Sequence, residues 1–249
     1  MTLIINEIRF SDELGEPYWI SAADRRLSYN GKFHSTRRKK IFPIKYLNAT
    51  ISFFGLAVWK IGHKELYLSD IIKDQITKLN NIKDLSLFSE KIVLRLNEKI
   101  PKNLLESHPT GVHISGFQKN GVPKFFYSSN IGKGVGWDYH NMRPELSIPS
   151  EELYDKLKTN YNWDGVSFEG LNNKGYLFRN GDIKSHVISS KKLDDILSEI
   201  IQTGGFRKIE NYYTHADFLM FKLNFIASLY KHWSDTESIG TPIDLYIHF

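Results

Sequence analysis

Three short stretches in the first quarter of the chain decide its fold. They read Ala22-Ala23-Asp24-Arg25-Arg26, then Lys39-Lys40-Ile41-Phe42-Pro43-Ile44, then Ser52-Phe53-Phe54-Gly55-Leu56-Ala57. Each stretch lies in or beside an apolar run rich in residues that favour strands, so each is expected on or next to a strand. Asp24 and Lys40 stand sixteen residues apart. Asp24 is expected at the end of a hairpin, and Lys40 within a strand from Lys39 to Ile44.

The sequence around these stretches predicts a run of antiparallel strands. Thr2 to Phe10 is apolar and β-prone, a polar turn follows at Ser11 to Pro17, and Tyr18 to Ala23 returns beside the first strand. Asn30-Gly31 suits a tight type I′ turn. Lys39 to Ile44 and Leu47 to Phe54 supply two further strands.

Helices and another hairpin follow. Apolar residues recur at helical spacing from Ser69 to Leu79, and again from Leu85 to Leu96, before Pro101 ends the second helix. Val112 to Phe117 and Pro123 to Ser128 flank a Gln-Lys-Asn-Gly turn, which predicts a hairpin. Two helices are thus expected between two sets of strands.

The last third is less regular until its end. Residues 134–212 are expected to be a family-specific elaboration, with a helix at Glu151 to Leu157, a hairpin at Gly175 to Ile188 and a helix at Lys191 to Ile201. An amphipathic helix at His215 to Trp233 precedes a closing strand at Pro242 to Phe249. This order of elements predicts one α+β domain over residues 1–249, a layered sandwich with its helices outside.

Composition sets limits on the class of protein. The chain has 249 residues, of which 41% are hydrophobic, so it can bury a sizeable core. It has no cysteine, which excludes disulfides and thiolate metal sites and favours a cytoplasmic setting. Neither an export signal nor a membrane span is expected. The net charge of +5 comes from 33 basic and 28 acidic residues, a balance that makes nucleic-acid binding an unlikely role.

The opening stretches resemble the start of proteasome β-type subunits and their bacterial relatives, which are N-terminal nucleophile hydrolases. In that family an N-terminal threonine is followed by an Ala-Asp-x-Arg segment, a Lys-Lys pair and a glycine closing the next strand. A second match lies at Asp235-Thr236-Glu237-Ser238-Ile239-Gly240, where the family has Asp-x-x-Ser-Gly-Gly before a strand. The resemblance implies a four-layer αββα sandwich of two antiparallel sheets flanked by helices.

The resemblance also implies a catalytic group. Thr2 would be the nucleophile once Met1 is removed, because an N-terminal α-amine with a pKa of about 7.7 to 8.0 can accept the hydroxyl proton. Lys40 would sit beside Thr2 and Asp24 would pair with Lys40. The backbone N–H of Gly55 would stabilise the oxyanion, Asp235 and Ser238 would support the amine, and Arg26 would have a structural role.

One segment of the sequence departs from the family pattern, and four residues are expected to set substrate specificity. Where the family has a Gly-Ser-Gly segment, this chain has Ile131-Gly132-Lys133-Gly134, and Ser128 or Ser129 would have to replace the missing serine. By position, the first specificity pocket is expected to involve Leu27, Arg38, Phe53 and Ala57. Phe53 would fill it and favour a small or acidic side chain before the scissile bond.

Other chemistries have weaker support in the sequence. The basic run Arg37 to Lys40 resembles a phosphate-binding patch, but strand alternation would disperse its charges and turn Lys40 inward with Arg38. The glycines at 132, 134 and 136 lack the Lys-Ser or Lys-Thr of a nucleotide loop and are expected in a flexible turn. Nine dispersed histidines give no His-Glu-x-x-His motif, so we expect neither a metal nor another cofactor.

The first functional hypothesis is therefore an N-terminal threonine peptidase that cleaves peptides or unfolded protein in the cytoplasm. Confinement of its active sites would require a homo-oligomer, either a ring or an open assembly, and any regulatory partner stays unknown. Two alternatives remain open. One is an amidase acting on a small non-peptide amide, and the other is a catalytically inactive assembly or binding subunit.

Overall fold

The computed structural model describes residues 2–10, 17–29, 32–134, 136–161, 171, 174–181, 191–204, 211–235 and 238–249. Met1, the turn expected before Pro17 and the Asn30-Gly31 pair lie outside the described residues. Within the described part, no helix is long and apolar enough to cross a bilayer.

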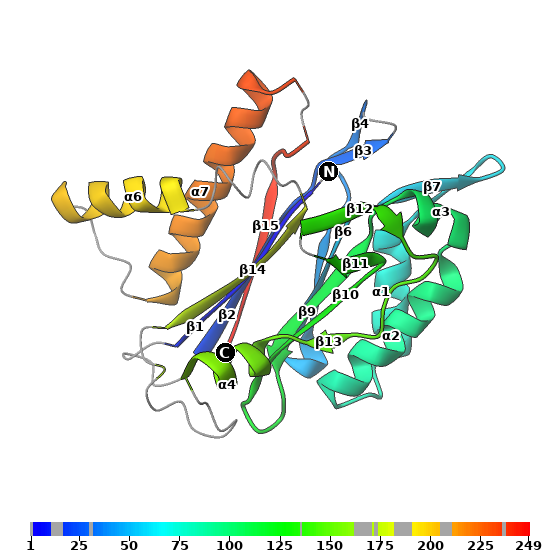
Figure 1. The fold of residues 1–249 in the computed structure, drawn as a ribbon, viewed down its shortest axis with the longest axis horizontal. Coiled ribbons are helices and arrows are strands. Elements are labelled where there is room, and N and C mark those ends of the chain that lie inside the picture. The colour runs from blue at the N-terminus through cyan, green and yellow to red at the C-terminus, as the bar shows by residue number, and fades with distance from the viewer. Residues whose placement is uncertain are drawn as a thin grey trace.

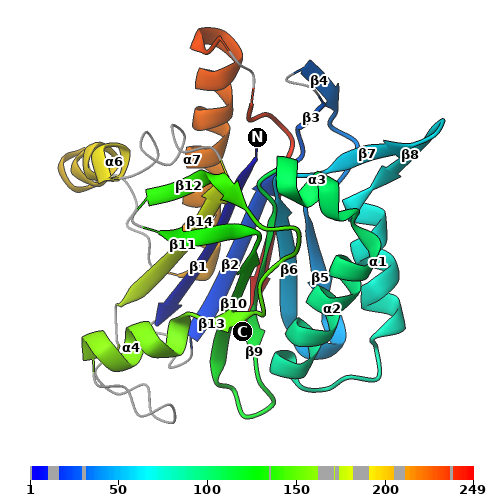
Figure 2. The same ribbon diagram turned by 45° about the vertical axis from the view of Figure 1, so that its right-hand side comes forward.

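Two antiparallel sheets face each other in the middle of the molecule (Figures 1 and 2). The first sheet has the strand order β14-β1-β2-β15, and the second has β13-β10-β9-β6-β5. The strands of the first are β1 (Leu3–Phe10), β2 (Pro17–Asp24), β14 (Gly175–Gly181) and β15 (Ile243–His248). Those of the second are β5 (Ile41–Ile44), β6 (Ala49–Phe54), β9 (Gly111–Phe117), β10 (Pro123–Ser129) and β13 (Ser150–Glu151).

Helices cover the outer faces of both sheets, as Figure 1 shows. Those on the second sheet are α1 (Leu68–Lys78) and α2 (Leu85–Lys99), and α7 (Tyr212–Trp233) lies on the first. Further helices in the described part of the chain are α3 (Lys102–Ser107), α4 (Leu153–Tyr161), α6 (Lys191–Thr203) and the 3₁₀ turn η1 (Lys45–Leu47). The predicted α+β sandwich with outer helices is confirmed.

The alternating side chains of β1 explain why it is central to the sandwich. Successive residues of a strand point to opposite faces. Leu3 and Ile5 pack in the cluster beneath α7, whereas Ile4 and Ile8 pack in clusters that include residues of the second sheet. All four are buried, so β1 is covered on both sides.

Several elements differ from the sequence prediction. Among the described residues, three two-stranded ribbons are present: β3 (Leu27–Tyr29) with β4 (Lys32–Ser35), β7 (Val58–Ile61) with β8 (Lys64–Tyr67), and β11 (Ile131–Gly134) with β12 (Gly136–Met142). The second ribbon and α3 were not predicted, and the third contains the glycines that were expected in a flexible turn. β14 begins at Gly175 as predicted, but it pairs with β1 at the edge of the first sheet. The rest of the expected hairpin, residues 182–188, lies outside the described part.

An ion pair ties the start of α7 to β1. Glu7 Oε2 lies 3.3 Å from His215 Nε2, and Arg9 Nε donates to Glu7 Oε1 at 2.7 Å. Burial alone would raise the pKa of Glu7, but the hydrogen bonds and charges of His215 and Arg9 lower it to about 2. A depressed pKa stabilises the fold at pH values above the unfolded pKa and ceases to do so as the pH falls through the folded pKa.

Glu7→Gln should therefore weaken the fold at pH 6 and matter less in acid. We expect a loss on the order of 3 kcal/mol at pH 6, which shrinks between pH 4.5 and pH 2 as the wild-type carboxylate is protonated. Urea unfolding at pH 6 and pH 3 measures this difference. Glu90→Gln, at an exposed position on α2, is the matched control and should change stability by less than about 0.5 kcal/mol at both pH values. An equal loss for Glu7→Gln at both pH values would contradict the assignment.

Candidate active site

A buried ion pair lies at the N-terminal end of β1. Lys40 Nζ donates to Asp24 Oδ1 at 3.0 Å, and neither side chain is exposed to solvent. Asp24 is the last residue of β2, and Lys40 directly precedes β5, so each sheet contributes one member of the pair. The sixteen-residue spacing seen in the sequence thus corresponds to a hydrogen-bonded contact between the sheets.

The Asp24 carboxylate also holds the beginning of the chain. Its Oδ1 accepts the backbone N–H of Leu3 at 2.8 Å, and its Oδ2 accepts the N–H of Arg26 at 3.1 Å. Because Leu3 follows Thr2 directly, the hydrogen bond from Leu3 N–H places Thr2 next to Asp24, which is itself bonded to Lys40. Thr2 itself is only 3% exposed.

The surroundings of Lys40 change its acidity. Burial lowers the pKa of the Lys40 ammonium, and the nearby charge of Arg26 adds to this, whereas the charge and hydrogen bond of Asp24 oppose it. The net result is a pKa below the usual value of a lysine. Lys40 therefore releases a proton more readily than an exposed lysine does, which is a property of groups that take part in proton transfer.

The second sequence match lies against the first. Ile243 pairs with Asp24 across β15 and β2, and the N–H of Arg25 donates to Pro242 O at 3.1 Å. Gly240 packs on Arg26, since a Cβ added at Gly240 would lie 3.1 Å from Arg26 Cδ. Segments more than 200 residues apart in the sequence thus meet beside Asp24.

The residues before Gly240 differ in their surroundings. Ser238 is 4% exposed, and Ile239 is buried in the cluster beneath α7 that also contains Leu3. Ile239, which stands where the family that the sequence resembles has a glycine, is therefore a core residue. Asp235 is exposed just after α7. Among the described residues, no contact joins its side chain to Thr2, Asp24 or Lys40.

Gly55 follows β6 in a backbone conformation that requires glycine. Its φ is +86°, and a Cβ at this position would lie 1.6 Å from the carbonyl oxygen of Pro109. The residue is exposed.

The expected pocket residues fall into two groups. Leu27, Phe53 and Ala57 are buried and belong to the core between the second sheet and its two helices. Arg38 instead turns outward, where its Nη1 donates to Asp70 Oδ1 at 2.6 Å and its guanidinium lies 4.2 Å from the centre of the Tyr67 ring. The expectation that Arg38 points inward with Lys40 is wrong, because β5 begins only at Ile41 and strand alternation does not extend back to Arg38.

The serines considered as replacements for the missing family serine already have partners. Ser128 Oγ donates to Ser147 O at 2.6 Å, and Ser129 Oγ donates to Ile131 O at 3.3 Å. Sequence reasoning did not single out the residues that hold the Gly55 loop, Thr110 and Asn130. Both are polar yet completely buried, a property that only their long-range contacts reveal.

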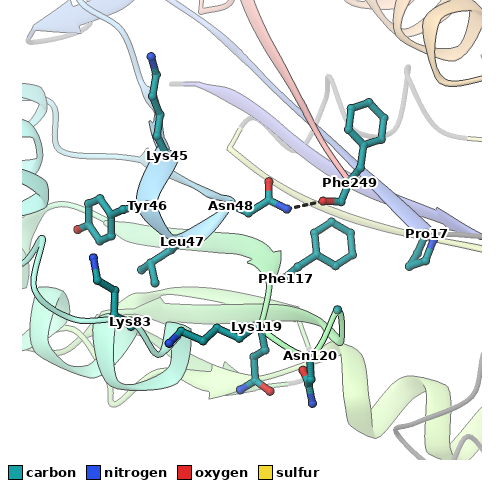
Figure 3. A pocket seen from close by; sticks show the side chains of 12 residues that line it. Pro17, Lys45, Tyr46, Leu47, Asn48, Lys83, Phe117, Lys119, Asn120 and Phe249 are labelled. Atoms are coloured by element: carbon teal, nitrogen blue, oxygen red, sulfur yellow. Dashed lines mark hydrogen bonds between the residues drawn. The ribbon is translucent and has the colours of Figure 1, made fainter.

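A cavity of about 540 Å³ opens at the other end of the sheets, away from Thr2 (Figure 3). It is lined by residues that include Pro17, Phe117 and the three lysines Lys45, Lys83 and Lys119. Asn48 Nδ2 donates to the carbonyl oxygen of Phe249 beside it. Pro17 pairs with Phe10, the last residue of β1, so the eight residues of β1 put this cavity roughly 25 Å from Thr2. It is separate from the Asp24–Lys40 pair.

Comparison with known proteins shows a likeness in fold but none in sequence. No protein-family model matches the chain, and no curated protein matches it in sequence. The fold is similar to that of Anbu (ancestral beta-subunit) from Yersinia bercovieri, with a TM-score of 0.51 and 13% sequence identity. The match covers 99% of this chain and 81% of Anbu. At this identity the likeness concerns the fold alone, and it shows that the chain adopts a proteasome-like sandwich of two antiparallel sheets and outer helices.

Proposed function

We propose that this protein is an N-terminal threonine peptidase that cleaves peptide bonds through an acyl-enzyme on Thr2 after Met1 has been removed. The observation that supports this most strongly is the fully buried Lys40–Asp24 pair, whose carboxylate also binds the N–H of Leu3. Burying two charges is costly, and apolar residues can often replace a buried ion pair with no loss of stability. Stability alone therefore does not explain the Lys40–Asp24 pair, and we propose that the pair acts in catalysis at the adjacent Thr2.

The proposed reaction begins with attack of Thr2 Oγ1 on the carbonyl carbon of the scissile peptide bond. The free α-amine of Thr2 accepts the hydroxyl proton, and the positive charge of Lys40 favours the neutral form of that amine. Asp24 keeps Lys40 in place, while the N–H of Gly55 binds the oxyanion. The C–N bond then breaks, the leaving amine takes the proton, and water hydrolyses the resulting ester.

Removal of Met1 creates the α-amine that serves as the base in this mechanism. Asp235 and Ser238 are proposed to support the new amine from the last turn before β15. Arg26 keeps the position of Asp24 by donating its backbone N–H to Oδ2.

The proposed substrates are peptides or unfolded protein segments. From sequence position alone, the first specificity pocket is proposed to involve Leu27, Arg38, Phe53 and Ala57, of which Leu27, Phe53 and Ala57 are buried in the core. Phe53 would leave room only for a small or acidic side chain. The name of Anbu describes a β-subunit, and we propose that this chain likewise works as a homo-oligomer that confines its active sites.

A fusion protein tests the proposal directly. In this fusion a carrier domain precedes Thr2. A protease that cleaves immediately before Thr2 then removes the carrier and leaves Thr2 as the first residue. We expect no hydrolysis of a panel of fluorogenic peptides before the cut and hydrolysis after it, because only the cut protein has the α-amine. Equal rates before and after the cut would rule out the N-terminal mechanism.

One sequence feature favours a second candidate, a non-catalytic assembly subunit. Lys133 stands where the family pattern has a serine, which is a change expected after loss of catalysis. A cut fusion protein that forms an oligomer in gel filtration but cleaves no peptide would favour this candidate. A monomer that hydrolyses small amides and leaves peptides intact would favour an amidase.

A further inference from the structure

The connection between α3 and β9 is held by a completely buried asparagine from a distant part of the sequence. Asn130 lies between β10 and β11 and has no exposed surface. Its Oδ1 accepts the N–H of Thr110 at 2.7 Å, and its Nδ2 donates to Leu105 O at 2.5 Å and to His108 O at 2.9 Å. The side chain thus forms hydrogen bonds to residues on both sides of Pro109.

The main chain of Asn130 makes equally defined contacts. Its N–H donates to Thr110 O at 3.0 Å, and its carbonyl oxygen accepts the N–H of Arg143 at 2.8 Å. Every polar group of this residue therefore has a partner. A buried asparagine with all its hydrogen bonds made tolerates little movement of the groups around it, because any displacement would leave a polar atom unpaired.

Thr110 passes this constraint on to the loop after β6. Its Oγ1 donates to His108 O at 3.0 Å and accepts the N–H of Leu56 at 3.3 Å. Pro109 O lies directly against Gly55, at the place where any other residue would have its Cβ. One hydrogen bond and one close steric contact thus hold the Gly55-Leu56 backbone. Both come from the segment His108 to Thr110, which is hydrogen-bonded to Asn130.

From this chain of contacts we infer that Asn130 and Thr110 are positioning residues for the backbone N–H of Gly55. The inference rests on the proposed function, in which that N–H binds the oxyanion of the tetrahedral intermediate. Neither residue would touch substrate. Asn130 sets the position of the segment from His108 to Thr110, Thr110 binds Leu56, and the orientation of the neighbouring Gly55 N–H follows.

Asn130 is also connected to a second part of the candidate site. Asn130 is followed directly by Ile131-Gly132-Lys133-Gly134, the segment in which this chain departs from the family pattern. Ile131 packs in one cluster with Ile4 of β1 and Phe54 of β6. Asn130 therefore joins the Gly55 loop, through short covalent and packing links, to the strand that begins next to Thr2.

Displacing the Gly55 N–H should change the kinetics in a specific way. Loss of one oxyanion donor typically lowers the rate about 10²- to 10³-fold, and a donor that is displaced rather than lost should cost less. Thr110→Val keeps the shape of the side chain but leaves the Leu56 N–H without its acceptor. We expect kcat to fall roughly 10- to 100-fold with KM changed less than about threefold, since the oxyanion forms only in the transition state.

The experiment compares Thr110→Val with Thr110→Ser, which keeps the hydroxyl, in protein whose first residue is Thr2. Peptide hydrolysis gives kcat and KM, and hydrogen–deuterium exchange of the segment from Phe54 to Trp59 reports how firmly the loop is held. Binding of a peptide aldehyde, which forms a hemiacetal with an oxyanion-like oxygen, provides a third measurement. Should Thr110→Val fail to fold, Thr110→Ala takes its place.

Support requires three results together. In Thr110→Val, kcat and aldehyde affinity should fall in parallel and exchange in the segment should become faster, while Thr110→Ser should retain most of each wild-type value. A Thr110→Val protein with kcat within twofold of wild type would overturn the inference, as would a rise in KM alone or a fall in kcat without faster exchange. Absence of hydrolysis in the wild-type protein would instead refute the proposed function on which the inference rests.

Discussion

Replacing Thr2 by alanine should abolish peptide hydrolysis while leaving the fold intact. The substitution removes the only atom proposed to attack the substrate, and loss of a nucleophile typically costs about 10⁴- to 10⁶-fold in kcat. The change in stability should be about 1 kcal/mol, because only a hydroxyl and a methyl group are lost from a small side chain. Peptide hydrolysis and urea unfolding, both on protein with residue 2 at its N-terminus, measure the two effects.

Thr2→Ser is the matched variant for this experiment. Serine keeps both the hydroxyl and the α-amine, so we expect turnover within about tenfold of wild type. An alanine variant as active as the serine variant would show that another group performs the reaction.

Replacing Lys40 should damage both activity and stability. Lys40→Met keeps a similar volume but leaves the Asp24 carboxylate buried without a counter-charge, which typically costs about 3–5 kcal/mol. Activity should fall about 10²- to 10⁴-fold, the usual contribution of a general base, because without the charge of Lys40 the α-amine of Thr2 is protonated and cannot accept the hydroxyl proton. Urea unfolding and steady-state hydrolysis give the two values, and Lys91→Met, at an exposed site on α2, should change neither.

A double variant separates the stability effect from the chemical one. In Asp24→Asn/Lys40→Met no charge is left unpaired, and asparagine Oδ1 can still accept the N–H of Leu3. We expect most of the lost stability to return and activity to stay low. Recovery of activity together with stability would mean that the ion pair is only structural.

The positions of Asp24 and Lys40, which form the proposed catalytic pair, could be predicted from the sequence because both lie next to strand ends. Apolar runs locate the end of β2 and the beginning of β5, and Asp24 and Lys40 occupy those positions. The family resemblance then adds that the two meet. The prediction does not extend to Arg38, which lies before the strand and turns outward to Asp70 on α1.

Other features depend on contacts that no local pattern records. β14 pairs with β1 although Gly181 and Leu3 lie at opposite ends of a long stretch of chain, and periodicity carries no information on such pairing. Asn130 reaches Thr110 and Leu105 in the same non-local way. The ribbon of β7 and β8 is a different case, since its turn has a local signal in the sequence, Gly62, whose φ is +59°.

The size of an element also limited the prediction. α3 has only six residues, too few for an apolar face to repeat, and it follows Pro101, which was interpreted only as the end of the preceding helix. η1 occupies Lys45 to Leu47 and shortens the strand that was expected from Leu47, so β6 begins at Ala49. Apolar residues alone do not distinguish a short turn from the first residues of a strand.

The most direct test of the central claim is intact mass spectrometry of the cut fusion protein before and after treatment with a peptide epoxyketone. This probe forms a ring with both the hydroxyl and the α-amine of an N-terminal threonine, so it requires the two groups that the mechanism assigns to Thr2. We predict a gain of one probe per chain, which is lost in Thr2→Ala and in the uncut fusion protein. An unchanged mass in a folded protein with Thr2 at its N-terminus would contradict the assignment of Thr2 as the nucleophile.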